Sequence, residues 1–155
     1  MSSAADRPPY ENYAAIAGVF VGGIATVAAL GRRAPAGTAL DLAALSAATF
    51  KASRTLSRER VASFVRQPFV EGEAATGEDE RPAGEGIQRA IGELVTCPRC
   101  VGAWSAAALA SSQVLAPRFG RLLTWSLGAA GANDFLQAAF KALCAKANEP
   151  EGVSS

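Results

Sequence analysis

The chain has 155 residues, which is enough for one domain, and half of its residues are hydrophobic. Its 15 basic residues nearly balance 14 acidic ones, so the net charge of +1 gives no reason to expect nucleic-acid binding. Histidine is absent, which excludes Ser-His-Asp and Cys-His catalysis and histidine-ligated zinc or haem within a single chain.

The first predicted helix, residues 13–31, follows a short N-terminal tail (1–12) and has no charge over 19 positions. At helical rise this length crosses a hydrocarbon core. A cleaved signal peptide is the alternative, but it needs a basic segment directly before a shorter apolar core. The preceding DRPPYEN and the following Arg32 and Arg33 favour a membrane span. Within it, Gly18 and Gly22 at GxxxG spacing predict a close helix contact.

The second predicted helix, residues 38–56, is apolar but short, and Asp41 interrupts it. It is long enough to span if Lys51 and Arg54 extend to the membrane interface. A half-buried or re-entrant helix is the alternative.

Residues 57–69 predict a basic amphipathic helix at the membrane surface, with Arg58, Arg60 and Arg66 off its apolar face. A solvated helix packed on the bundle fits the same pattern. Residues 71–86 follow with six acids and four glycines, and we expect a flexible acidic loop there.

Two further apolar helices are predicted at 100–116 and 122–140, which completes a helical membrane domain over 13–145 before a disordered tail, 146–155. Asn133 and Asp134 lie within the last helix. An ionisable group at membrane depth, as Asp41 would also be, indicates either a bond between helices or a polar path for transport.

The basic residues fall unevenly on the two sides of four such spans. Eleven belong to the termini and the central segment, and four belong to the two hairpin loops. The positive-inside rule therefore places both termini and the central segment in the cytoplasm. The predicted fold is all-α, with about four membrane-embedded helices and one basic surface helix. A soluble alanine-rich bundle is the alternative, although it explains the long uncharged runs poorly.

Residues 92–104 read GELVTCPRCVGAW and carry the most specific motif, GEL-xx-CP-x-C-x-G-x-W. With the R-x-PF at Arg66 and the basic stretch 51–60, it resembles DUF1360, a bacterial family of small membrane proteins of uncharacterised function. The resemblance covers about residues 38–116 and implies membrane residence without a reaction. The motif positions are Gly92, Glu93, Leu94, Cys97, Pro98, Cys100, Gly102 and Trp104.

The CPRC pair allows three interpretations. It could be a redox dithiol, because a helix N-terminus lowers the pKa of the first thiol. It could hold zinc with Cys144 and with Glu93 or a second subunit. The favoured interpretation is structural, with Pro98 starting a helix and the cysteines packing as small apolar groups.

We therefore expect a small multi-pass protein of the bacterial cytoplasmic membrane, with both termini in the cytoplasm, acting as a structural, scaffold or accessory subunit. No catalytic residue and no cofactor are assigned, zinc being the alternative. The expected partners are the bilayer with its anionic lipid headgroups and a larger membrane complex or further copies of the chain, but not nucleic acid. A thiol-redox or zinc-dependent protein and a small transporter are the competing functions.

Overall fold

The computed structural model describes residues 9–32, 37–72 and 80–148, and the expected all-α class is confirmed there. The longer helices are α1 (Tyr10–Leu30), α2 (Ala39–Arg58), α4 (Gly86–Thr96), α5 (Pro98–Leu115) and α6 (Pro117–Ala147). The short elements are the 3-10 turns η2 (Arg60–Ala62) and η3 (Gln67–Phe69), the helix α3 (Ser63–Arg66) and the antiparallel strands β1 (Val70–Glu71) and β2 (Arg81–Pro82).

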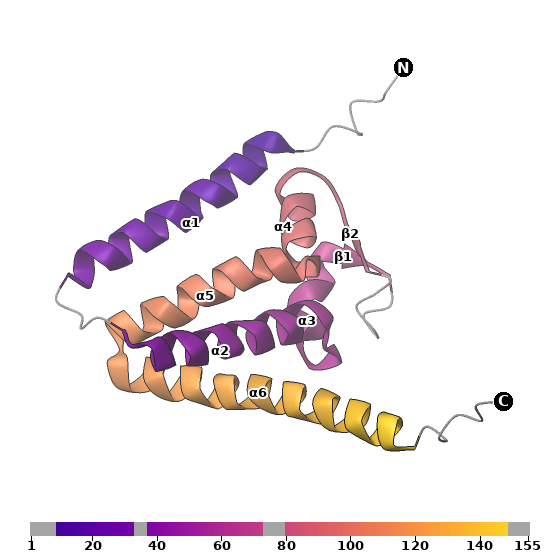
Figure 1. Ribbon diagram of the computed structural model, residues 1–155. Coiled ribbons are helices and arrows are strands. Elements are labelled where there is room, and N and C mark those ends of the chain that lie inside the picture. The colour runs from indigo at the N-terminus through magenta and orange to yellow at the C-terminus, as the bar shows by residue number, and fades with distance from the viewer. Residues whose placement is uncertain (1–8, 33–36, 73–79, 149–155) are drawn as a thin grey trace.

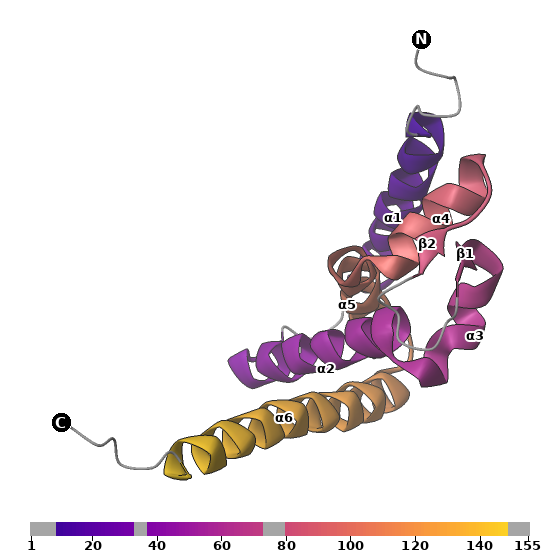
Figure 2. The same ribbon diagram turned by 90° about the vertical axis from the view of Figure 1, so that its right-hand side faces the viewer.

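Helices α5, α2 and α6 lie side by side, and α1 runs along the far side of α5 (Figures 1 and 2). The start of α1, the end of α2, the start of α5 and the end of α6 all lie towards one end of the molecule (Figure 1). Helices α3 and α4 and both strands gather at this end. It holds most of the motif residues.

Helix α6 packs on α2 through small residues. Its buried positions recur every three or four residues and so form one face: Gly120, Thr124, Gly128 and Gly131. A Cβ at Gly128 would lie 2.9 Å from the carbonyl oxygen of Ala44, and a Cβ at Gly131 would collide with that of Ala47. The α2–α6 contact thus depends on the missing Cβ atoms. This close contact was not predicted from the sequence.

Helix α1 is the one helix in the described ranges that is long and apolar enough to cross a membrane, with a mean hydropathy of 2.0 over its best window. None of its residues is buried. It contacts α5 through an edge-to-face pair between Phe20 and Trp104, with ring centroids 5.0 Å apart. No other part of the described chain comes within 4 Å of a Cβ placed at Gly18 or Gly22. The predicted glycine contact of α1 is therefore wrong within one chain, and four spans are not established.

The prediction of one basic surface helix over 57–69 is wrong. Helix α2 continues to Arg58, and Glu59 then adopts an extended backbone that separates α2 from the short turns η2, α3 and η3. Within this segment Arg58 and Arg60 are exposed, but the side chain of Arg66 is completely buried. Arg66 cannot contact lipid headgroups, because its guanidinium is fully engaged inside the protein.

The acidic segment 71–86 is also less simple than a solvated loop. Residues 73–79 lie outside the described residues, but Glu80 is buried and pairs with Arg66, and Ala83 is buried beside it. The segment therefore returns to the core and forms β2 before α4 begins. A count of acids and glycines does not predict this return, because it cannot show that Glu80 has a buried partner elsewhere in the chain.

Several boundaries differ from those predicted. Helix α1 begins at Tyr10, inside the expected tail 1–12, and residues 1–8 lie outside the described part. Helix α6 begins at Pro117 and ends at Ala147, so its 31 residues extend about 46 Å, well beyond the predicted 122–140. Of the expected C-terminal tail, residues 149–155 are likewise not described.

Asp41 has a local structural role at the start of α2. The Thr38 hydroxyl accepts a hydrogen bond from the Asp41 amide at 3.2 Å, and the Asp41 carboxylate accepts one from the Thr38 amide at 2.9 Å. This reciprocal capping box satisfies backbone donors that the first turn leaves open. Asp41 is therefore a capping residue in the first turn rather than a polar group deep inside a helix.

Candidate functional site

The candidate site is the turn between α4 and α5, where the CPRC motif lies. Helix α4 ends at Thr96, and Cys97 has the extended backbone that a residue before proline favours. Pro98 occupies the first turn of α5, where its missing amide hydrogen costs nothing. The Cys97 Sγ accepts a hydrogen bond from the Cys100 amide at 3.4 Å and so caps α5. The predicted role of Pro98 as a helix start is confirmed.

The two thiols of this turn are in contact and chemically unequal. Their Sγ atoms lie 2.8 Å apart, with Cys100 donating, and both cysteines are free. The hydrogen bond from Cys100 lowers the pKa of Cys97, and backbone amide donors and Arg99 lower it further. Desolvation and the neighbouring Cys97 raise the pKa of Cys100 to about 11. One thiol therefore ionises far more readily than the other, and the thiolate is the nucleophilic form of cysteine.

A carboxylate lies beside the turn. Glu93, on α4, accepts a hydrogen bond from the Tyr13 hydroxyl of α1. It also forms an ion pair with Arg89, whose Nε lies 3.2 Å from Glu93 Oε1. The Tyr13–Glu93 contact joins residues 80 positions apart in the sequence. It fixes the start of α1 against α4. Glu93, which we singled out as a metal ligand, thus has two protein partners instead.

A cavity of about 380 Å³ lies between α1, α4 and α5. Phe20 and Trp104 form part of its mainly apolar wall, Glu93 and Tyr13 provide its polar groups, and Cys100 reaches its surface. Of the two thiols, Cys100 is therefore accessible from an apolar, ring-lined space. Trp104 serves as a wall of this cavity, a role that its motif spacing could not reveal.

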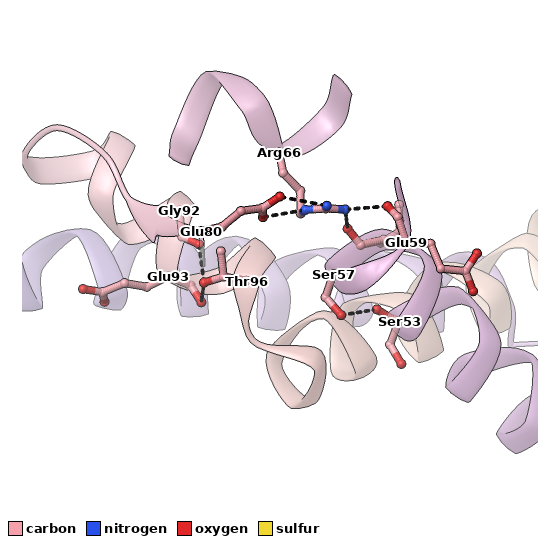
Figure 3. A network of polar contacts seen from close by, with 9 residues as sticks. Ser53, Ser57, Glu59, Arg66, Glu80, Gly92, Glu93 and Thr96 are labelled. Atoms are coloured by element: carbon pink, nitrogen blue, oxygen red, sulfur yellow. Dashed lines mark hydrogen bonds and ion pairs between the residues drawn. The ribbon is translucent and has the colours of Figure 1, made fainter. Parts of the chain in front are cut away.

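A buried ion pair lies close to α4, the helix that leads into the turn (Figure 3). Arg66 donates to Glu80 through Nε at 2.8 Å and Nη2 at 2.9 Å, and through Nη1 to the carbonyl oxygens of Leu56 and Glu59. One side chain thereby joins the end of α2, the helix α3 and the segment that enters β2. Charge-assisted bidentate pairs of this kind are geometrically specific.

Gly92 lies where α4 packs against the segments that the ion pair holds in place. A Cβ at this position would collide with the Phe69 carbonyl oxygen and lie 3.1 Å from the Cα of Pro82, so only glycine allows α4 to pack against η3 and β2. Thr96 Oγ1 donates to the Gly92 carbonyl at 2.9 Å in the last turn of α4 (Figure 3). The motif glycine thus positions the helix that ends at Cys97. A Cβ at Gly102, in contrast, would meet the Ser53 side chain at the ordinary contact distance of 3.9 Å.

The remaining predicted site residues do not join the thiol pair. Cys144 is exposed near the end of α6. Among the described residues, no three histidine, cysteine, aspartate or glutamate side chains are grouped so that they could hold a metal ion. The proposed set of Cys97, Cys100, Cys144 and Glu93 is therefore not assembled in this structure.

The polar residues of α6 face two environments. Asn133 is exposed, whereas Asp134 forms an ion pair with Lys51 of α2, whose Nζ lies 3.1 Å from Asp134 Oδ2. Lys51 also pairs with Glu59 at 2.9 Å. Asp134 thus bonds across the α2–α6 interface, which is one of the two roles the sequence allowed.

Comparison with known families agrees with the motif. The model of the family described as "Protein of unknown function (DUF1360)" matches residues 44–140, which includes α4, α5 and most of α2 and α6. No curated protein and no solved structure matches the chain. The match extends the resemblance beyond residue 116 to Asp134 and the small-residue face of α6. Because it covers more than half of the sequence, the chain belongs to the DUF1360 family.

Proposed function

We propose that the protein is a small integral membrane protein that acts as a structural or accessory subunit. The observation that carries this proposal is the unpartnered apolar surface. No residue of α1 is buried, and Leu136, Phe140 and Leu143 on α6 expose 68–69% of their surface. Soluble monomers rarely expose contiguous apolar patches of this kind. A bilayer would cover them.

The arrangement of the helices supports a multi-pass topology. A chain that enters through α1 and continues through α2, α5 and α6 would return to the same side after each pair of helices. The α3–α4 end would then be cytoplasmic, because most of the basic residues belong to it and to the termini. The span in α5 would begin at Val101, which leaves the CPRC turn outside the hydrocarbon region.

Carbonate extraction of membranes that contain the full chain tests this proposal. An integral protein stays in the membrane pellet at alkaline pH, because hydrophobic insertion does not depend on charge. A variant with Val19 and Val21 both changed to lysine places two charges in α1 and should be extracted or degraded. Recovery of most of the unaltered protein in the soluble fraction would overturn the proposal.

The geometry of the thiol pair favours a second candidate, a membrane-bound thiol reductant. The carrying observation is the 2.8 Å contact between two thiols of opposite pKa shift. In this scheme the Cys97 thiolate attacks a disulfide of a partner protein, and a mixed disulfide forms while one partner thiolate leaves and takes up a proton. Cys100 then loses its proton and attacks Cys97, which releases the second partner thiol. Two electrons pass to the partner, and the Cys97–Cys100 disulfide forms.

Trapping of the mixed disulfide tests this candidate. Cys100→Ser retains the attacking thiolate but cannot resolve the intermediate, so disulfide-linked adducts should accumulate on non-reducing gels. Cys97→Ser should give none, and Cys144→Ser serves as the matched control. Equal adducts from Cys97→Ser and Cys100→Ser, or none from either, would rule out the redox role and leave the accessory role in place.

A further inference from the structure

The apolar cavity between α1, α4 and α5 has one thiol of the CPRC pair in its wall. Its volume of about 380 Å³ is in the range that small organic ligands occupy in proteins. Phe20 and Trp104 form an edge-to-face pair, with ring centroids 5.0 Å apart, and both line the cavity. Aromatic walls of this kind favour a planar, apolar ring compound, because rings pack well against one another.

The oxygen-bearing side chains of this wall form a pair of hydrogen-bonding groups. Among the described residues that line the cavity they are Tyr13 and Glu93, and the Tyr13 hydroxyl donates to the Glu93 carboxylate. A carboxylate accepts more than one hydrogen bond, and a phenol both donates and accepts. The pair can therefore accept from a ligand hydroxyl, and the Tyr13 hydroxyl can turn to donate to a ligand carbonyl. A ring compound with oxygen atoms at its edge fits this wall.

The thiol in the wall belongs to a pair that can release two electrons. Cys100 lines the cavity, and its Sγ lies 2.8 Å from that of Cys97. Both cysteines are free, and the formation of a disulfide between them would release two electrons and two protons. Quinones are planar, apolar ring compounds with oxygen atoms at the edge, and they take up two electrons and two protons.

We infer that this cavity binds a quinone, which the Cys97–Cys100 dithiol reduces to a quinol. The inference rests on the redox role proposed above for the thiol pair, but it names a small apolar molecule as the electron acceptor in place of a protein disulfide. Cys100 is the thiol that meets this acceptor, because it lies in the cavity wall.

The reaction balances in two steps. Cys100 passes its proton to the Cys97 thiolate along their hydrogen bond, and the Cys100 sulfur bonds to a ring carbon while one quinone oxygen takes up a proton from water. Cys97 then loses its proton to the second quinone oxygen, and its sulfur attacks Cys100. The sulfur–sulfur bond forms, the sulfur–carbon bond breaks, and the electron pair stays on the ring. The products are one disulfide and one quinol.

Two alanines of α1 offer a matched pair of variants. Ala17 lines this cavity, whereas Ala15 lines a second apolar cavity of about 260 Å³. Both alanines are exposed, and no residue of α1 is buried, so neither substitution enters a packed core. Ala17→Phe should fill the space that the quinone needs, and Ala15→Phe adds the same side chain outside it. Thermal melting checks that each variant is folded.

Binding is measured on the purified full chain in a mild detergent. The probe is a fully substituted benzoquinone with a short alkyl chain, because full substitution prevents permanent addition of thiols to the ring. The chain has two tryptophans, so Trp125→Phe leaves Trp104 as the fluorescent reporter in the cavity wall. The quinone should quench Trp104 in a saturable way. Ala17→Phe should weaken the binding at least about tenfold, because the ligand must then overpack the cavity, and Ala15→Phe should not change it.

Electron transfer is measured without oxygen, from the absorbance of the quinone and by titration of thiols. Each chain should reduce one quinone and lose two of its three thiols. Cys97→Ser and Cys100→Ser should each abolish the reduction. Cys144→Ser should retain it, because Cys144 is exposed near the end of α6.

Two results would overturn the inference. One is an equal affinity of Ala17→Phe and Ala15→Phe for the quinone. The other is quinone binding to the unaltered protein with no loss of thiols. The trapping experiment separates these failures from a failure of the redox role itself. Disulfide-linked adducts in Cys100→Ser, together with no quinone reduction by the unaltered protein, would remove the quinone site and leave thiol exchange with proteins in place.

Discussion

Arg66 and Glu80 form an ion pair in which both side chains are completely buried, with Nε and Oε2 2.8 Å apart. A second hydrogen bond joins Nη2 to Oε1 at 2.9 Å, and Nη1 is satisfied by two carbonyl oxygens at the end of α2. No charge-bearing atom of the arginine side chain is left without an acceptor. The pair anchors the return of the acidic segment and, through β2 and Gly92, the helix that carries the CPRC turn.

Arg66→Met should therefore destabilise the protein by about 3–5 kcal/mol, because it leaves the Glu80 carboxylate buried without a partner. Arg60→Met, at an exposed position of the same segment, should change the stability by less than about 0.5 kcal/mol. Thermal or chemical unfolding in detergent measures both. A double variant, Arg66→Met with Glu80→Leu, should recover much of the loss. Equal stability of Arg66→Met and Arg60→Met would contradict the burial of the pair.

The small-residue face of α6 gives a second prediction. In Gly131→Ala the new Cβ would collide with the backbone oxygen of Ala47, so α2 and α6 must separate, at a cost of about 1–3 kcal/mol. Gly22→Ala is the matched control, since nothing lies within 4 Å of its Cβ. There alanine should be neutral or stabilising by up to about 1 kcal/mol through helix propensity. A lower melting temperature for Gly22→Ala than for Gly131→Ala would place the close helix contact on α1 instead of α6.

The unequal thiols predict a distinct pH profile for alkylation. Because the pKa of Cys97 lies below its ordinary value, Cys97 carries more thiolate than a free cysteine at neutral pH and should react first with iodoacetamide. Cys100, with a pKa of about 11, should react only as the pH approaches that value. Mass spectrometry of the modified peptides resolves the two sites. In Cys97→Ser the Cys100 profile should move to lower pH, because two of the causes that raise its pKa come from Cys97. A faster reaction of Cys100 at neutral pH would refute the asymmetry.

Replacement of both thiols separates a structural turn from a metal site. Cys97→Ser with Cys100→Ser should cost about 1 kcal/mol or less per site, because serine can also cap α5 and neither thiol fills a sealed core. If the pair held zinc, the same change would remove two anionic ligands and much of the folding free energy. Unfolding curves and elemental analysis of the purified protein make the comparison. Loss of folded protein together with loss of stoichiometric zinc would contradict the structural role.

The parts of the fold that follow from local chemistry were predictable. Apolar runs predicted four of the helices, and Pro98 marked the start of α5, because hydrophobic pattern and proline geometry act within one segment. The buried pair of Arg66 and Glu80 could not be predicted in this way. Each residue has several oppositely charged candidates in the sequence, and only the tertiary fold selects the partner. The sequence pattern placed Arg66 on a solvent-facing side for the same reason.

The site shows the same division. The adjacency of Cys97 and Cys100 follows from their spacing on one helical turn, whereas the contact of Tyr13 with Glu93 depends on how α1 packs on α4. The glycine contact was predicted on α1 and is found on α6, because GxxxG spacing states which residues are small but not what lies opposite them.

Thiol labelling across the membrane tests the central claim most directly, namely that the protein is integrated with the CPRC turn on the cytoplasmic side. A membrane-impermeant maleimide should leave Cys97 unmodified in intact spheroplasts and should modify it in inverted vesicles. Cys144, at the end of α6 on the same side, should follow the same pattern, and a cysteine introduced by Arg118→Cys at the opposite end should show the reverse. Modification of Cys97 in intact spheroplasts, or the same labelling of all three sites in both preparations, would contradict the account.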